Sequence, residues 1–375
     1  MMFCTPVALL QRNILLFIVV CLTATLPTIA QSSKTSPVKG NIITTGAAAA
    51  VLPDHDSTYY HSFDHYITTR FYFSQKYAGL ELERPIGVSK FRYVPNTSLT
   101  MGVGVTYQSI SLNLGYGFGF LNNDGIKGKT RYLDLQSHIY GRAWTIDMLG
   151  QFYSGYYLTP KGLAASSPDA YYIRPDLKIR LFGVSAYHLL NADRFSYRAA
   201  HLQNEKQLRS AGSILIGAET YYGIVKADSS LVPSALSENY GQKGVRRLDF
   251  IKLGPGIGYA YTLVIQKNFF LTGSLCASAT LDYSYQQGAK EKAEKFDVNK
   301  DFIYRIVAGY DKNNWNVNLA LVGNQLTVTS ATTKDKYLLS SGNFRLTLAH
   351  RFAPGHKLSN RLRPLDDMIR NVRGR

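Results

Sequence analysis

The sequence predicts an all-β protein, an antiparallel transmembrane β-barrel of about 12–14 strands. Three observations predict this fold: apolar and polar residues alternate over most of the chain, several alternating segments exceed ten residues, and the last ends on an aromatic residue, Phe352. Aromatic residues make up 13% of the chain and charged residues only 18%, against about 25% charged residues in an average soluble domain. This composition favours β structure over disorder, coiled coil or collagen.

The first thirty residues are typical of a cleaved secretory signal peptide. The positively charged Arg12 precedes a nine-residue apolar run at 14–22, and small residues follow at Thr28 and Ala30. A helix needs about 20 residues to cross the hydrocarbon core of a bilayer, so a transmembrane anchor is the weaker interpretation. Cleavage would leave Cys276 as the single cysteine, and the exported chain would fold without an intrachain disulfide.

The chain therefore divides into four predicted segments. The leader is expected to lack order because His55 to His61 is polar and Ala47 to Ala50 shows no strand-like alternation. No internal repeat, low-complexity tract or linker indicates a second domain. The segments are a signal peptide at 1–30, a poorly ordered periplasmic leader at 31–62, an outer-membrane β-barrel at 63–352 and a short basic C-terminal tail at 353–375.

Alternation with a period of two is clearest between Phe269 and Tyr285. There the odd-numbered residues are mostly apolar and the even-numbered ones mostly polar, which is the pattern of a strand with two different faces. Short polar breaks join many such segments, as expected for antiparallel hairpins. The expected strands cover residues 66–74, 77–93, 98–107, 110–120, 130–140, 143–155, 176–190, 193–203, 211–224, 250–264, 268–285, 301–311, 315–330 and 337–352.

Alternation alone does not separate a soluble sandwich from a membrane barrel, because both have one apolar and one polar face. Strand length favours the barrel, since a tilted strand needs about nine to eleven residues to cross a bilayer. One feature does not fit. The short breaks near 108, 141 and 191 fall on one side of the predicted barrel and those near 266 and 312 on the other. Either a strand is missed or split between 204 and 248, or several external connections are short.

Seven segments give the chain a family resemblance. They are 93–97 (YVPNT), 112–118 (LNLGYGF), 127–142 (KGKTRYLDLQSHIYGR), 171–176 (YYIRPD), 194–205 (RFSYRAAHLQNE), 227–233 (ADSSLVP) and 254–262 (GPGIGYAYT). Over roughly residues 60–352 the sequence resembles the domain-of-unknown-function family 4421 of Bacteroidetes. The resemblance implies an outer-membrane β-barrel without an established activity and brings no catalytic or binding residues. His201 and the basic tail after Phe352 depart from the family pattern.

Charged side chains are expected on the lumen face of the barrel. With 42 Lys and Arg against 25 Asp and Glu the formal charge is +17, which favours anionic partners. Charges of both signs in a barrel interior usually pair across strands and brace the lumen; an open pore is the alternative and would favour anions. The residues expected in the lumen are Lys178, Arg180, Arg198, Arg305, Arg345, Asp134, Asp147, Glu219 and Asp282.

No catalytic, cofactor-binding or metal-binding residues are predicted. The eight histidines and one remaining cysteine lack the tight spacing of metal ligands. A lipid hydrolase is only a remote alternative, because such an enzyme needs imidazole beside a hydroxyl on one strand face. The pairs that could serve are His55 with Ser57, His138 with Ser137, and His188 with Ser185.

The C-terminal tail concentrates positive charge. Pro364 is expected to begin a helix with one apolar stripe. In the periplasm such a tail is expected to meet lipid phosphates or a protein partner. Its basic residues are Lys357, Arg361, Arg363, Arg370, Arg373 and Arg375.

These expectations describe a non-enzymatic barrel in the outer membrane of a Gram-negative bacterium. The leading hypothesis is a structural or accessory protein with a braced lumen. The alternative is a channel or transporter for small, preferentially anionic solutes. The expected partners are outer-membrane lipid and lipopolysaccharide, with no nucleic acid and no cofactor.

Overall fold

The computed structural model describes residues 55–83, 90–108, 110–118, 121, 125–289 and 291–373. These residues belong to one compact unit, Asp54–Arg375. The predicted signal peptide and most of the predicted leader lie outside the described residues. The elements are β1 (Tyr60–Ser62), β2 (Ile67–Leu82), β3 (Arg92–Val94), β4 (Leu99–Tyr107), β5 (Ile110–Gly117), η2 (Gly125–Lys127), β6 (Arg131–Tyr140), β7 (Trp144–Thr159), β8 (Ile173–Leu189), α2 (Tyr197–His201), β9 (Glu205–Gln207), β10 (Ala211–Lys226), η3 (Ser234–Asn239), β11 (Arg247–Ile265), β12 (Phe269–Gln287), β13 (Lys292–Lys312), β14 (Trp315–Thr329), β15 (Lys336–Phe352) and α3 (His356–Arg373).

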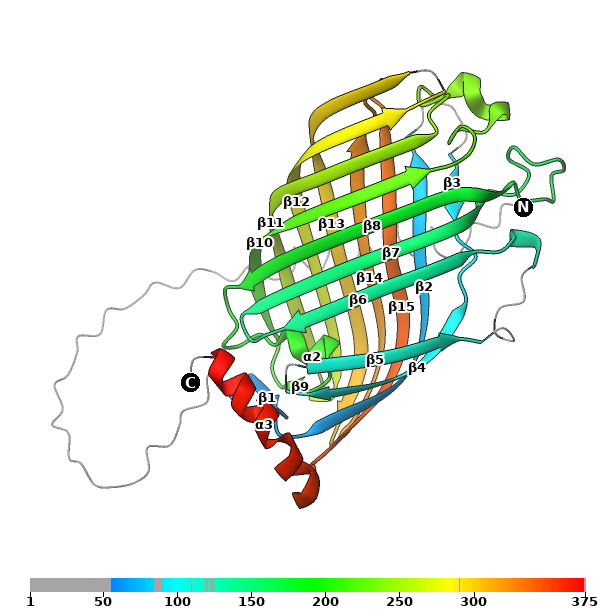
Figure 1. The fold of residues 1–375 in the computed structure, drawn as a ribbon. Coiled ribbons are helices and arrows are strands. Elements are labelled where there is room, and N and C mark those ends of the chain that lie inside the picture. Colours follow the sequence, from blue (N-terminus) through cyan, green and yellow to red (C-terminus); the bar gives the residue numbers. More distant parts are fainter. Residues whose placement is uncertain are drawn as a thin grey trace, which may run out of the picture. The chain divides into compact units, whose positions relative to one another are not determined.

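Antiparallel pairing closes the long strands into a barrel (Figure 1). β2 pairs with β15 from Ile67 opposite Phe352 to Leu82 opposite Tyr337, which joins the first and last strands of the wall. On its other edge, β2 bonds to the short strand β3, and β3 bonds to β7. Ten strands form this closed ring, and β4, β5 and β6 extend the wall beyond β3. The predicted all-β barrel is confirmed.

The wall contains twelve strands of eight or more residues among those the structure describes. Fourteen strands were expected, and two errors account for the difference from the twelve observed. The segments 66–74 and 77–93 are not separate, because β2 runs through both. The segment 193–203 was predicted wrongly as a strand, because it contains the short helix α2.

Because residues 193–203 do not form a strand, the short turns no longer fall on two different sides of the barrel. The connections 108–109, 141–143, 266–268 and 313–314 now all fall at one end of the barrel, which we call the turn end. The long connection from β8 to β10 starts and finishes at the same end. The other connections lie at the opposite end, the loop end.

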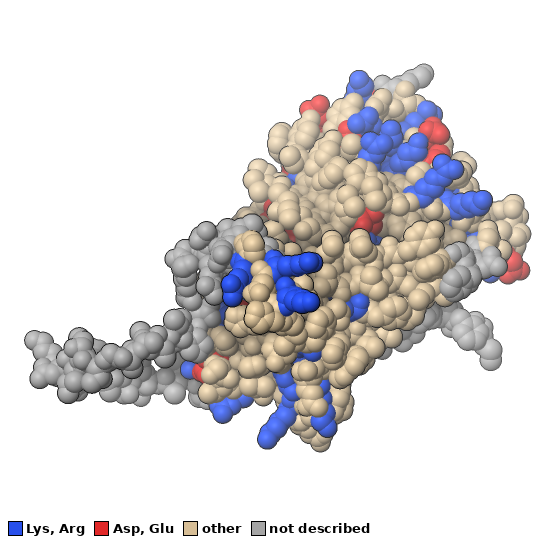
Figure 2. Space-filling model, turned by 60° about the horizontal axis from the view of Figure 1, so that its bottom comes forward, with Lys and Arg blue, Asp and Glu red and all other residues tan. Residues whose placement is uncertain are grey.

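The outer face of the strands is apolar along their middle. Leu253, Ile257 and Leu281 are 59–62% exposed, whereas Lys252 and Asp282, which point inward, are buried. Figure 2 shows few charged side chains on the band between two charged ends. This is the facing expected for a barrel in lipid and the reverse of a soluble sandwich.

Two boundaries differ from the prediction. The ordered chain starts before residue 63, because Tyr60–Ser62 forms β1 and the Tyr60 side chain is buried. In the tail, α3 begins at His356, and Pro364 lies inside the helix instead of starting it. No helix in the described part of the chain is long and apolar enough to cross a membrane.

Candidate functional site: the plugged lumen and its side cavity

Two segments fill the turn end of the barrel, residues 55–66 and 190–210, and we call them the plug. β1 and β9 pair with each other and with no wall strand among the described residues, and Figure 1 shows them with α2 at this end. Phe195, Tyr197 and Leu202 of the plug belong to one buried apolar cluster with inward-facing residues of the wall. The plug therefore packs as a core inside the barrel.

The local sequence explains why α2 forms where a strand was predicted. Ser196 caps the helix, since its side chain accepts a hydrogen bond of 2.9 Å from the Ala199 amide. Phe195 and Tyr197 alternate with polar residues by coincidence, which imitates the strand period. The cap and the adjacent Ala199 and Ala200 were the signals against a strand, although a five-residue helix offers little pattern to detect.

Arg198 connects the two segments of the plug to each other and to the wall. Its guanidinium lies 2.6 Å from the Asp64 carboxylate and 3.1 Å from that of Glu205. It also donates to the carbonyl oxygen of Gln108, in the turn between β4 and β5, at 2.9 Å. The side chain is 1% exposed, so the three partners are needed to offset the cost of burying its charge.

Two arginines of the wall strands β15 and β2 also bind the plug. Arg351 donates to the carbonyl oxygen of Gln203 at 2.5 Å and pairs with the Asp311 carboxylate. Arg70 donates to the Gln203 side-chain oxygen at 2.7 Å. It also donates to the carbonyl oxygen of Leu202. These contacts fix the plug at several points of the ring.

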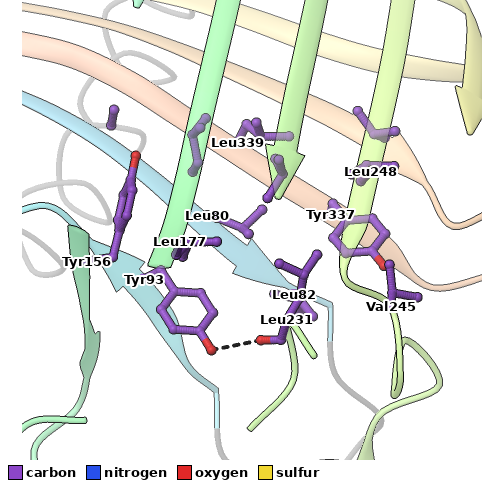
Figure 3. Packing of buried hydrophobic residues seen from close by; sticks show 14 of the residues in the cluster. Leu80, Leu82, Tyr93, Tyr156, Leu177, Leu231, Val245, Leu248, Tyr337 and Leu339 are labelled. Atoms are coloured by element: carbon purple, nitrogen blue, oxygen red, sulfur yellow. Dashed lines mark hydrogen bonds between the residues drawn. The ribbon is translucent and has the colours of Figure 1, made fainter. Parts of the chain in front are cut away.

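The loop end is closed by apolar side chains (Figure 3). Leu231, from the connection between β10 and β11, is fully buried with Leu80 and Tyr93 of the wall. The Tyr93 hydroxyl donates to the Leu231 carbonyl oxygen at 2.7 Å, which ties the connection to the wall. The lumen is thus occupied by packed side chains at both ends.

Most of the predicted lumen charges lie inside the barrel, in pairs or polar clusters. Arg305 contacts the Asp147 carboxylate at 2.5 Å, and the same carboxylate lies 2.5 Å from His138 Nδ1. The structure places these predicted residues in the interior: Arg198, Arg305, Arg345, Asp134, Asp147, Glu219 and Asp282.

Lys178 and Arg180 were placed wrongly, because both side chains are exposed on the outer face of β8. The reason is that the interior of the barrel changes from apolar to polar along β8. Near the loop end the interior is the apolar core, so the neighbours Leu177 and Ile179 turn inward and the cations turn outward. Towards the turn end the interior is polar, and Phe182 is 43% exposed on the outside.

Sequence reasoning missed a buried lysine that organises the interior. Lys252 is fully buried, and its ammonium contacts the Asp282 carboxylate and lies 3.3 Å from that of Asp301. The signal was present, since Lys252 stands between two lipid-facing residues, Ile251 and Leu253.

A second interior cluster depends on a glycine. The Tyr187 hydroxyl donates to the Glu219 carboxylate, and Tyr221 donates to it at 3.1 Å. A Cβ atom at Gly256 would lie 2.3 Å from the Tyr187 oxygen, so only glycine leaves room for this ring.

In two of the three histidine and serine pairs considered for hydrolysis, the two side chains point to opposite faces of a strand. Adjacent residues of a strand point to opposite faces, which separates Ser137 from His138, and the odd spacing separates Ser185 from His188 in the same way. His55 stacks on the Tyr60 ring with centroids 4.2 Å apart.

A polar cavity of about 240 Å³ lies between the plug and the wall. Its lining includes two arginines, Arg70 and Arg345, and two histidines, His138 and His201, but no carboxylate. Arg345 lies 4.5 Å from the Tyr72 ring centroid, and its buried Nε has no hydrogen-bond partner among the described residues.

The cavity reaches the only break in the wall of the described strands. β5 pairs with β4, and β6 pairs with β7, but β5 and β6 do not pair with each other. We call the region between them the seam. Leu112 and Asn113 of β5 and Gln136 of β6 line the cavity, so it extends to both edges of the seam.

The basic residues of the tail are only partly described. Lys357, Arg361 and Arg363 are exposed in α3. The side chains of Arg370, Arg373 and Arg375 lie outside the described residues. A periplasmic partner of this tail stays a prediction.

Acidification is expected to destabilise the plug through His201. Burial, and next the nearby Arg305 guanidinium, lowers the pKa of this histidine from 6.5 to about 3. The unfolded chain then binds a proton that the folded chain does not, so stability is lost as the pH falls below about 6.5. His201→Asn should reduce the loss of unfolding free energy between pH 7.5 and pH 5, measured by urea titration in lipid vesicles. An unchanged pH dependence, equal to that of the exposed-site control His61→Asn, would contradict this.

Comparisons with known proteins identify a family and add no activity. The model of a family described as a domain of unknown function (DUF4421) matches residues 54–352. A search of curated proteins found no match. Among solved structures, the outer membrane protease OmpT from Escherichia coli is similar with 10% identity and a TM-score of 0.37, covering 76% of this chain and 97% of that one. Ail, the attachment invasion locus protein of Yersinia pestis, has 9% identity and a TM-score of 0.18, covering 76% and 98%. The P. putida toluene transporter TodX has 6% identity and a TM-score of 0.22, covering 78% and 91%.

Proposed function

Since the chain belongs to the DUF4421 family, described as a domain of unknown function, we propose a role from its own geometry: a non-enzymatic outer-membrane barrel with a closed lumen, acting as a structural or accessory protein. The short turns face the periplasm in this arrangement, as in bacterial barrels generally. The plug and α3 then lie on the periplasmic side.

The packing of side chains at both ends of the lumen is the observation that supports this proposal. A diffusion pore needs a continuous water path, whereas here a salt-bridged plug fills the turn end and an apolar core fills the loop end. Burying charged side chains such as Arg198 and Arg351 costs free energy unless every partner is kept. The ion pairs of both arginines with carboxylates therefore support a plug that stays in place.

Conductance in a planar bilayer tests this proposal. The full chain is expected to show no stable unitary steps. Arg198→Leu leaves Asp64 and Glu205 without their shared cation, so brief or noisy openings should appear in that variant. The control Arg180→Leu changes an exposed arginine of β8 and should stay silent. Regular steps from the unmodified protein would reject the closed lumen.

The cation-lined cavity favours a second candidate, a channel or transporter for small anions. Arg70 and Arg345 line it without a carboxylate, and rings of such residues select anions in other pores. If the unmodified protein conducts, the reversal potential in a salt gradient should show anion preference.

A further inference from the structure

We propose that the side cavity binds the phosphate headgroup of a phospholipid, which enters from the bilayer through the seam between β5 and β6. This inference rests on the proposed membrane location and goes beyond it by naming a ligand class.

The seam leaves backbone groups of two strands without a strand partner. In the hydrocarbon core every backbone N–H and C=O needs a partner, and each one left without costs several kcal/mol. The facing edges of β5 and β6 have none from another strand among the described residues. A wall open to hydrocarbon alone would be unfavourable, so an occupant with polar atoms, together with water, is expected there.

The charge of the cavity selects an anion. Among the described residues, Arg345 has no carboxylate partner, and its guanidinium lies over the face of the Tyr72 ring. Elsewhere in the interior, Arg198, Arg305 and Arg351 each pair with a carboxylate. An arginine without a carboxylate partner is able to donate charge-assisted hydrogen bonds to a phosphate oxygen.

The His201 ring adds a second unpaired polar atom near the same space. Its buried Nε2 has no partner in the described part of the chain, and the residue lines the cavity. A cavity of about 240 Å³ is smaller than the roughly 300–1,000 Å³ of sites that enclose a whole small ligand. It therefore fits a headgroup whose chains remain outside.

The outer surface beside the seam suits acyl chains. Leu112, Leu114 and Tyr116 of β5 are 59–69% exposed, and Leu133 and Leu135 of β6 are 54–55% exposed. A lipid with its headgroup in the cavity would lay its chains between these two rows. Because the plug forms one wall of the cavity and lies at the turn end, the lipid would come from the periplasmic leaflet.

Native mass spectrometry of the detergent-solubilised full chain tests the inference. The probes are phosphatidylglycerol, diacylglycerol with the same chains, and inorganic phosphate. One phosphatidylglycerol should bind per chain, with the other two probes about tenfold weaker or more. Equal binding of diacylglycerol would show a merely apolar contact, and equal binding of inorganic phosphate would show a free-anion site; either result overturns the lipid assignment.

Variants assign the binding to the cavity. Arg345→Gln should weaken phosphatidylglycerol binding about tenfold or more, and Arg345→Lys should weaken it less. Arg180→Gln, on the outer face of β8, should leave it unchanged. Unchanged binding in Arg345→Gln would overturn the inference. Heat-modifiable migration checks folding, and flotation with vesicles checks membrane insertion. If the unmodified protein floats with vesicles but binds no phosphatidylglycerol, only the lipid site is refuted, and the proposed barrel function stands.

Discussion

Lys252→Met is expected to lower the free energy of unfolding by about 3–5 kcal/mol. The Lys252 ammonium is fully buried between the Asp282 and Asp301 carboxylates and donates to the Thr327 carbonyl oxygen at 2.5 Å. Methionine fills a similar volume but leaves two buried carboxylates without a cation. Urea titration of the refolded protein in lipid vesicles measures the loss.

Two further variants show whether charge, and not packing, causes the effect. The triple variant Lys252→Met, Asp282→Asn, Asp301→Asn removes all three charges and should recover most of the stability. Lys178→Met removes an exposed cation from β8 and should change stability by less than about 0.5 kcal/mol. If Lys252→Met is as stable as the unmodified protein, the buried cluster does not stabilise the barrel as the geometry indicates.

The wall of the barrel was predictable because its strands have one environment on each face. In β12, Leu281 meets the outside and Asp282 the inside, and the sequence alternates accordingly. The pairing of β2 with β15, which closes the barrel, could not be predicted from the sequence. The register between distant strands depends on side-chain packing, and an alternation with a period of two does not encode it. The barrel class could therefore be predicted, but its closure through β3 could not.

The interior was harder to predict because it is not uniformly polar. The apolar core near the loop end reverses the facing of Lys178 and Arg180, although the local alternation is regular. The plug escaped prediction because Phe195 and Tyr197 have the spacing of a strand. The two errors have different origins. On β8 the alternation reports that two faces differ but not which face is inside, whereas at 193–203 a coincidental alternation imitates a strand.

Leu275→Arg is expected to cost about 2–4 kcal/mol of unfolding free energy, which tests directly which face meets lipid. Leu275 lies near the middle of β12 and faces outward, between Phe269 at the turn end and Tyr283 towards the loop end. An arginine there must lose its hydration or drag water into the hydrocarbon.

The inward-facing control position on β12 is Ser278. It is only 3% exposed, so overpacking should make Ser278→Arg destabilising as well. A loss of stability therefore does not distinguish the inner from the outer face of β12 at Ser278. Labelling of an introduced cysteine does distinguish them. With Cys276 replaced by serine, a cysteine at 275 should react with a lipid-soluble maleimide and resist a charged one. Rapid reaction with the charged reagent in intact vesicles would place Leu275 in water, and the outer face of β12 would then not be the lipid face.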